Sequence, residues 1–273
     1  MSLHRFPTRA VAAIVATALL ALAAGCGSDE TSTTTVTDGR ADESGARRVE
    51  GIVTVFAAAS LTDVFTELGE QFEEANPGAT VEFSFGPSSG LVTQVLEGAP
   101  ADVVATAAVS NMEDLVDGEV LDGDPVDFAT NLLEIAVPAG NFGGVTGLDD
   151  LSDDGLLVAL CAEEVPCGRF AREALAGSGV EPAIDSNEED VRALLTKLEA
   201  GEVDVGIVYR TDVTAAGDAV EGIAIPDEQN VTATYPIAVA DEATNAEGGR
   251  AFIDFVLSDD GLSALTGAGF GPP

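Results

Sequence analysis

Residues 53–62 read VTVFAAASLT, and this stretch decides the fold because it passes from a strand into a helix. Residues 53–57 are mostly apolar and rich in β-branched and aromatic side chains, which indicates a buried strand. Ser60 then precedes apolar residues at helical spacing, beginning with Leu61, so we expect it to be a helix N-cap. A strand that runs directly into a helix is typical of α/β proteins.

The same alternation continues along the chain. Strands are expected at 53–57, 81–85, 102–106, 132–137, 156–160, 203–209 and 235–240. Helices are expected at 61–72, after Leu91, at 112–116, from near Gly168, at 188–200, 246–257 and 261–265. Strands that alternate with helices predict parallel α/β sheets.

The first 50 residues have the composition of an export signal and a tether. Basic residues at the start are followed by an apolar run over 10–24 that is short for a transmembrane helix. Residues 23–26 (AAGC) resemble a bacterial lipoprotein cleavage site, which implies a signal peptide over 1–26 and a lipid on Cys26. A retained membrane anchor is the alternative. Residues 27–50 are rich in Ser, Thr, Asp and Gly, so we expect a disordered tether.

Composition excludes several classes of function. The chain has 48 acidic and 11 basic residues and a net charge of −37, so no basic patch for nucleic acid is expected. The only histidine, His4, lies in the leader. A Ser-His-Asp hydrolase or a histidine-ligated zinc site therefore has no imidazole in the mature chain.

Two cysteines remain after Cys26 is assigned to lipid. Cys161 and Cys167 form an even pair in an exported chain, so they are a disulfide candidate. Two free buried thiols are the alternative.

Small hydrogen-bond donors stand where strands end and helices begin. They are Ser60, Ser88, Ser89, Cys167, the residues around Val191, and Tyr209. Ligands of open α/β sheets bind at this edge, and helix N-termini hold oxyanions without lysine or arginine. We see no acceptor at these junctions, which suits an oxyanion that carries no proton, such as sulfate or molybdate. Phosphate arrives partly protonated and needs an acceptor.

Several motifs resemble the substrate-binding proteins of molybdate ABC transporters. They are residues 53–62, the Ser88-Ser89 loop, 98–103 (GAPADV), 165–168 (VPCG), 189–192 (EDVR), 206–209 (GIVY) and 235–239 (YPIAV). The resemblance implies a two-lobed α/β periplasmic-binding-protein fold of type II, a Venus flytrap with two hinge crossovers. It places lobe one at 51–130 and 236–273, and lobe two at 131–235.

The resemblance also implies a set of ligand-binding residues. These are the hydroxyls and backbone of Ser60 and Ser88, the backbone N–H groups of Cys167 and Val191, and the hydroxyl of Tyr209, with Ser89 as an additional donor. The expected protein is a monomeric, lipid-anchored, extracytoplasmic receptor for molybdate and tungstate. It needs no cofactor, binds no nucleic acid, touches the membrane only through its lipid, and delivers its ligand to an ABC permease.

Three alternatives stay open from the sequence. The first is a receptor of the same fold for sulfate or another tetrahedral oxyanion. The second is a hydrolase with Ser60 or Ser88 as nucleophile, for which the sole lysine, Lys197, would have to be the base. The third is an adhesion or scaffold protein without a small ligand.

Overall fold

The computed structural model describes residues 49–273, and within them nine strands form one mixed sheet. The expected signal peptide, the expected lipid-bearing Cys26 and nearly all of the expected tether lie outside these residues. Glu50, which the sequence assigned to the tether, is the first residue of β1. Among residues 49–273, no helix combines the length and the apolar character needed to span a bilayer.

Strands and helices alternate along most of the described chain. The strands are β1 (Glu50–Ala58), β2 (Gly78–Gly86), β3 (Val103–Ala105), β4 (Val126–Pro138), β5 (Val158–Cys161), β6 (Ile184–Glu188), β7 (Val205–Tyr209), β8 (Val220–Ala224) and β9 (Thr232–Val239). The helices are α1 (Thr62–Ala75), α2 (Ser88–Leu96), α3 (Val109–Asp117), α4 (Pro166–Gly177), α5 (Val191–Glu199), α6 (Arg210–Ala216), α7 (Ala246–Val256) and α8 (Asp259–Gly267). Short 3-10 helices lie at η1 (Ala59–Leu61), η2 (Leu148–Ser152) and η3 (Gly217–Ala219).

The sheet contains two parallel groups joined by antiparallel strands. Its order is β2-β1-β3-β9-β4-β7-β5-β6, with β8 paired to β4. β1, β2 and β3 pair in parallel, as do β5, β6 and β7. β4 and β9 are antiparallel to their neighbours. The parallel pairing expected from the alternation of strands and helices is thus present in both groups, whereas β4, β8 and β9 pair antiparallel.

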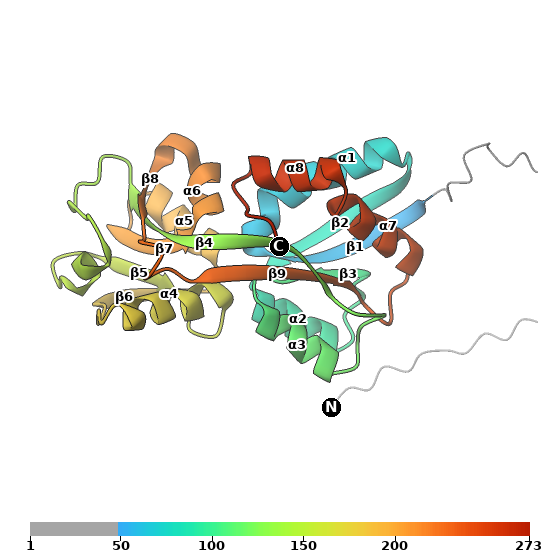
Figure 1. Ribbon diagram of the computed structural model, residues 1–273, viewed down its shortest axis with the longest axis horizontal. Helices are drawn as coiled ribbons and strands as arrows, with labels where there is room; N and C mark the ends of the chain where they lie inside the picture. Colours follow the sequence, from blue (N-terminus) through green and yellow to red (C-terminus); the bar gives the residue numbers. More distant parts are fainter. Residues whose placement is uncertain (1–48) are drawn as a thin grey trace, which may run out of the picture. The chain divides into compact units, whose positions relative to one another are not determined.

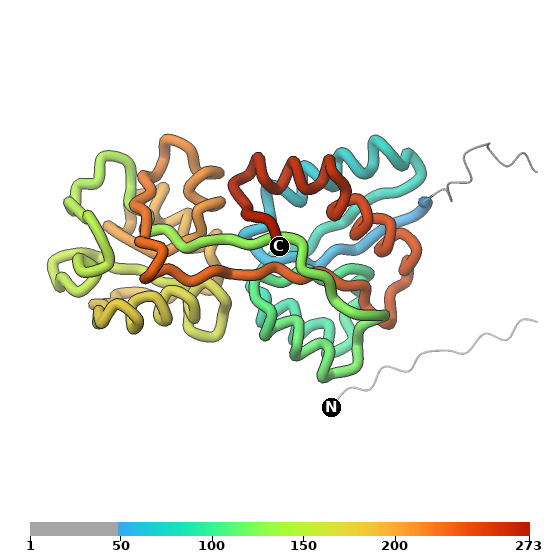
Figure 2. Tube along the Cα trace, viewed as in Figure 1, coloured from blue at the N-terminus to red at the C-terminus, as the bar shows by residue number. Residues whose placement is uncertain are grey.

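β4 and β9 are the two crossovers of a two-lobed α/β fold (Figures 1 and 2). Residues 126–132 of β4 pair with β9, and residues 133–136 of the same strand pair with β7. β9 in turn pairs with β3. Each crossover strand thus has a hydrogen-bonded neighbour on each of its two edges: β9 lies between β3 and β4, and β4 lies between β9 and β7.

Helices cover both parts of the sheet and bury their apolar faces. α1 packs against β2 and α7 against β1, whereas α4 packs against β5 and α5 against β7. The apolar face of α1 is buried as its spacing predicts. Phe65 on that face contacts the rings of Phe83, Phe128 and Phe252 at centroid distances of 6.3, 5.7 and 5.9 Å. This aromatic core fixes the position of α1, and with it the turn that precedes the helix.

Four elements differ from the sequence-based expectation. The helix predicted over 188–200 begins at Val191, because Glu188 still belongs to β6. The side chain of Asp190 caps that helix by accepting the N–H of Ala193 at 2.9 Å. β6, β8 and α6 were not predicted.

Candidate anion-binding site

A small cavity of about 20 Å³ lies between helical N-termini of the two lobes. It brings together five of the six residues that the sequence singled out: Ser60, Ser88, Cys167, Val191 and Tyr209. Ser60 comes from η1, Ser88 from α2, Cys167 from α4 and Val191 from α5, and Tyr209 ends β7. Ser89 is not among the lining residues. Its carbonyl accepts a hydrogen bond from Thr93 Oγ1 at 2.9 Å.

Ser88 is held as a donor toward the cavity. It is 1% exposed and is the first residue of α2. Its Oγ accepts the backbone N–H of Ala107 at 3.0 Å. Because that hydrogen bond occupies the oxygen from behind, the hydroxyl proton remains available for a ligand.

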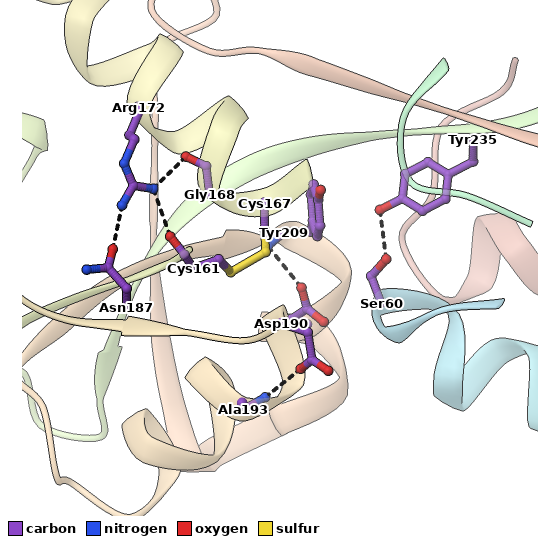
Figure 3. The surroundings of a disulfide bond; sticks show 11 residues. Ser60, Cys161, Cys167, Gly168, Arg172, Asn187, Asp190, Ala193, Tyr209 and Tyr235 are labelled. Atoms are coloured by element: carbon purple, nitrogen blue, oxygen red, sulfur yellow. Dashed lines mark hydrogen bonds between the residues drawn. A yellow bond between two sulfur atoms is a disulfide. The ribbon is translucent and has the colours of Figure 1, made fainter. Parts of the chain in front are cut away.

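Ser60 is not the N-cap that the sequence predicted. It is the middle residue of η1, and α1 begins after Leu61 with no side-chain cap. The chain tightens into a 3-10 turn before the α-helix starts, so the Ser60 side chain is free of the helix backbone. Its Oγ lies 2.9 Å from the hydroxyl of Tyr235 on β9 (Figure 3).

Lobe two contributes two helix starts. Cys167 is the second residue of α4, after Pro166, and Val191 is the first residue of α5. Backbone N–H groups at these positions have no acceptor within their own helix, and the helix dipole favours an anion there. Proline suits the first position because it has no N–H to leave unpaired.

The Tyr209 hydroxyl is buried without a partner. Tyr209 is 1% exposed, and its Oη makes no hydrogen bond to the described residues. Burial raises the pKa of this hydroxyl well above its ordinary value, so it stays protonated and able to donate. Leaving a buried polar atom without a partner costs free energy, so this hydroxyl is a candidate donor to a ligand in the cavity.

A carboxylate also lines the cavity, contrary to the expectation of no acceptor there. Asp190 is a lining residue, and its Oδ1 is the acceptor that caps α5. An aspartate directly before a helix is a common N-cap. The sequence therefore contains a signal for Asp190, although only the backbone N–H groups of this helix start were predicted to face a ligand.

A second carboxylate lies just outside the cavity. Asp212 is 1% exposed and accepts the backbone N–H of Tyr209 at 3.0 Å. Burial raises its pKa to about 7, although that hydrogen bond and the charge of Arg192 act in the opposite direction. Asp212 thus holds the end of β7 from behind.

The loop that carries Cys167 is fixed by three features (Figure 3). A disulfide joins Cys161 to Cys167. The guanidinium of Arg172 donates to the carbonyls of Cys161 and Gly168, at 2.7 and 2.9 Å, and to Asn187 Oδ1. A Cβ on Gly168 would lie 1.8 Å from the carbonyl oxygen of Ala162, so only glycine fits there.

No lysine or arginine lines the cavity, but two arginines bridge the lobes near it. Arg192 of α5 pairs with Asp63 of α1 at 2.8 Å. Arg169 of α4 donates to Ser110 of α3 at 2.9 Å. The positive charges thus lie beside the ligand position, in contacts between lobes. No local pattern in the sequence predicts these contacts.

The geometry does not favour the serine hydrolase. Lys197, the base that such an enzyme would need, pairs with Glu188 at 2.6 Å and does not line the cavity. Among residues 49–273 no group of three or more His, Cys, Asp or Glu side chains is arranged to hold a metal ion. A wider surface hollow between α1 and α8 is lined by Glu67, Glu74 and Asp260, whose charges disfavour an anion.

Comparison with known proteins agrees with this architecture. The family model of bacterial extracellular solute-binding proteins matches residues 53–271. The molybdate-binding protein ModA of Mycobacterium tuberculosis is 37% identical over 221 residues, which cover 81% of this chain and 85% of that protein.

Two solved structures share the fold. The periplasmic molybdate-binding protein of Azotobacter vinelandii has a TM-score of 0.73 at 19% identity and covers 81% of this chain and 99% of its own. The sulfate-binding protein SubI of Mycobacterium tuberculosis has a TM-score of 0.71 at 21% identity, with coverage of 82% and 87%. At such identities the two structures show the fold alone.

Fold and site together define a two-lobed solute-binding protein. The chain belongs to the bacterial extracellular solute-binding protein family, in which the molybdate-binding ModA proteins are its homologues.

Proposed function

We propose that this protein is an extracytoplasmic receptor that binds molybdate and tungstate and delivers them to an ABC importer. The observation that carries the proposal is the cavity itself, in which serine and tyrosine hydroxyls and helix N-termini converge without a lysine or arginine. Such a donor set binds a tetrahedral oxyanion through short hydrogen bonds. The 37% identical ModA relative supports molybdate as the ligand.

Closure of the two lobes would complete the ligand shell. In this proposal lobe one comprises residues 51–130 and 236–273, and lobe two comprises residues 131–235. Ser60 and Ser88 belong to the first lobe, and Cys167, Val191 and Tyr209 to the second. A ligand that contacts both lobes stabilises the closed state by its differential affinity for that state.

The receptor would work as a monomer tethered to the membrane. The signal peptide and Cys26 support a lipid anchor, and the tether gives the domain reach toward the permease of its importer. The acidic surface is consistent with a partner other than nucleic acid.

Sulfate is the alternative ligand, because it has the same charge and shape as molybdate. Cavity size would then be the basis of selection. Phosphate must be considered as well, because the Asp190 carboxylate in the cavity wall can accept the proton of hydrogen phosphate. Hydrogen phosphate is therefore disfavoured less strongly than it would be in a cavity lined by donors alone.

Thermal unfolding with molybdate, tungstate, sulfate and phosphate, at equal concentration and fixed ionic strength, tests the proposal. A ligand that binds only the native state raises Tm by mass action. We expect a large rise with molybdate and tungstate alone. A rise with sulfate or phosphate instead would keep the receptor and change its ligand, and no rise with any of the four would contradict the proposal.

A further inference from the structure

Tyr235 contacts a ligand-binding serine but does not line the cavity. It lies on the crossover strand β9 and is 0% exposed. Its Oη is 2.9 Å from Ser60 Oγ (Figure 3). The two residues are 175 positions apart in sequence. A buried hydroxyl placed behind a ligand-binding hydroxyl can determine which way that group points its proton.

The neighbouring Asn131 favours one direction for this hydrogen bond. The backbone N–H of Leu132 donates to Asn131 Oδ1 at 3.0 Å, which sets the orientation of the side-chain amide. The amide nitrogen therefore faces Thr211 Oγ1 at 2.8 Å and Tyr235 Oη at 3.5 Å. An amide nitrogen only donates, so the Tyr235 oxygen is the acceptor of that longer contact.

With Asn131 donating to its oxygen, Tyr235 has its phenolic proton available for Ser60 Oγ. Burial raises the pKa of Tyr235, so the proton is present throughout the physiological range. When Ser60 Oγ accepts this proton, the Ser60 hydroxyl has its own proton free for the cavity. Hydrogen bonds in such a chain polarise and strengthen one another.

Ser88 shows the same arrangement independently. Its oxygen accepts the N–H of Ala107 from behind, at 3.0 Å. Each of the two lobe-one serines thus has a donor directed at its oxygen. A serine hydroxyl can otherwise be donor or acceptor, and an acceptor would repel an unprotonated anion.

We propose that Tyr235 is a positioning residue that makes Ser60 a hydrogen-bond donor to the bound oxyanion. This inference rests on the proposed function. The chain of hydrogen bonds would run from Asn131 through Tyr235 and Ser60 to the anion, across both crossover strands. Tyr235 acts only through Ser60 and makes no contact with the ligand.

A double-mutant cycle on the full-length chain tests this, with molybdate affinity measured by titration calorimetry. We expect Tyr235→Phe to weaken binding about 3- to 10-fold, as for loss of one neutral hydrogen bond. Ser60→Ala should weaken it by about 10- to 100-fold, because a bond to an anion is lost. The double variant should bind like Ser60→Ala alone, since Tyr235 then has no group to position.

Additive losses in the double variant would overturn the inference, because they would show that Tyr235 acts independently of Ser60. Unchanged binding by Tyr235→Phe would overturn it as well. Thr211→Val is the control: it removes another partner of Asn131 but leaves the contact to Tyr235, so affinity should stay the same. If the unsubstituted chain binds none of the four oxyanions, the proposed function fails together with the inference.

Asn131→Ala provides a second variant should Tyr235→Phe fold poorly. It removes the donor behind Tyr235, and we expect a loss of about 2- to 3-fold. That loss must also disappear when Ser60 is already alanine. A loss that persists in the Ser60→Ala background would contradict the relay.

Discussion

At the scale of one residue, loss of the Tyr209 hydroxyl should weaken ligand binding without lowering the stability of the ligand-free protein. Its Oη is buried and has no partner among the described residues, so removing it should not lower the Tm of the ligand-free protein. We expect Tyr209→Phe to keep or slightly raise that Tm and to weaken molybdate binding by about 10- to 100-fold. Calorimetry with and without molybdate measures both quantities. Unchanged affinity would show that this hydroxyl does not reach the anion.

The raised pKa of Asp212 makes the free energy of unfolding decrease as pH rises. Burial raises its pKa from 3.8 to about 7, so between these values the folded chain keeps a proton that the unfolded chain releases. The associated stability is full below about pH 4 and is lost as pH rises through 7. We expect the Tm of Asp212→Asn minus that of the unsubstituted protein to increase from pH 4 to pH 8. At about 1.4 kcal/mol per pKa unit, the full effect is on the order of 4 kcal/mol.

Asp150 is the control of opposite sign. Its pKa is lowered, chiefly by the backbone N–H of Thr146. Its contribution is present above the ordinary pKa of an aspartate and is lost as pH falls. Asp150→Asn should therefore lower Tm at pH 7 and lose this effect on acidification. A difference for Asp212→Asn that stays flat from pH 4 to 8 would contradict the assignment.

At the scale of the element, the N-terminal turn of α4 is fixed by close backbone contact. A Cβ at Gly168 would lie 1.8 Å from the Ala162 carbonyl, whereas a Cβ at Gly177 in the same helix meets nothing within 4 Å. We expect Gly168→Ala to lower the free energy of unfolding by about 1–3 kcal/mol and to weaken anion binding, because the turn must move. Gly177→Ala should be neutral or slightly stabilising. Equal effects of the two substitutions would contradict this account.

The elements also show what the sequence could and could not predict. A strand end followed by a helix start is a local pattern, so the sequence could predict five residues that line the cavity: Ser60, Ser88, Cys167, Val191 and Tyr209. β6 was missed because its sequence, IDSNE, is largely polar and pairs only at an edge of the sheet. The contact between Ser60 and Tyr235 joins distant segments, and only the folded sheet brings these together.

At the scale of the whole molecule, the ion pair between Asp63 and Arg192 holds the two lobes together. Removing the Asp63 side chain has two effects of opposite sign on the affinity for an anion. Loss of the contact disfavours closure and weakens binding, whereas loss of a negative charge strengthens it. We expect Asp63→Ala to weaken molybdate binding a few-fold, mainly through faster dissociation, measured by stopped-flow fluorescence or calorimetry.

A matched ion pair serves as the control. Asp122 pairs with Arg250, and both residues are partly exposed, as are Asp63 and Arg192. Neither Asp122 nor Arg250 lies in lobe two, so Asp122→Ala should leave the dissociation rate unchanged. Tighter binding by Asp63→Ala would show that the charge outweighs the contact and that the pair does not hold the closed state.

Because β9 lies between β3 and β4, the two parts of the sheet can form at different times during synthesis. The pairings among β5, β6, β7, β8 and the second part of β4 all lie within residues 133–224. In lobe one, by contrast, β3 pairs with β9, whose residues 232–239 are synthesised later. During secretion, lobe two can therefore close its sheet while lobe one still presents the open edge of β3. That edge stays open to wrong pairing until residues 232–239 are available to cover it.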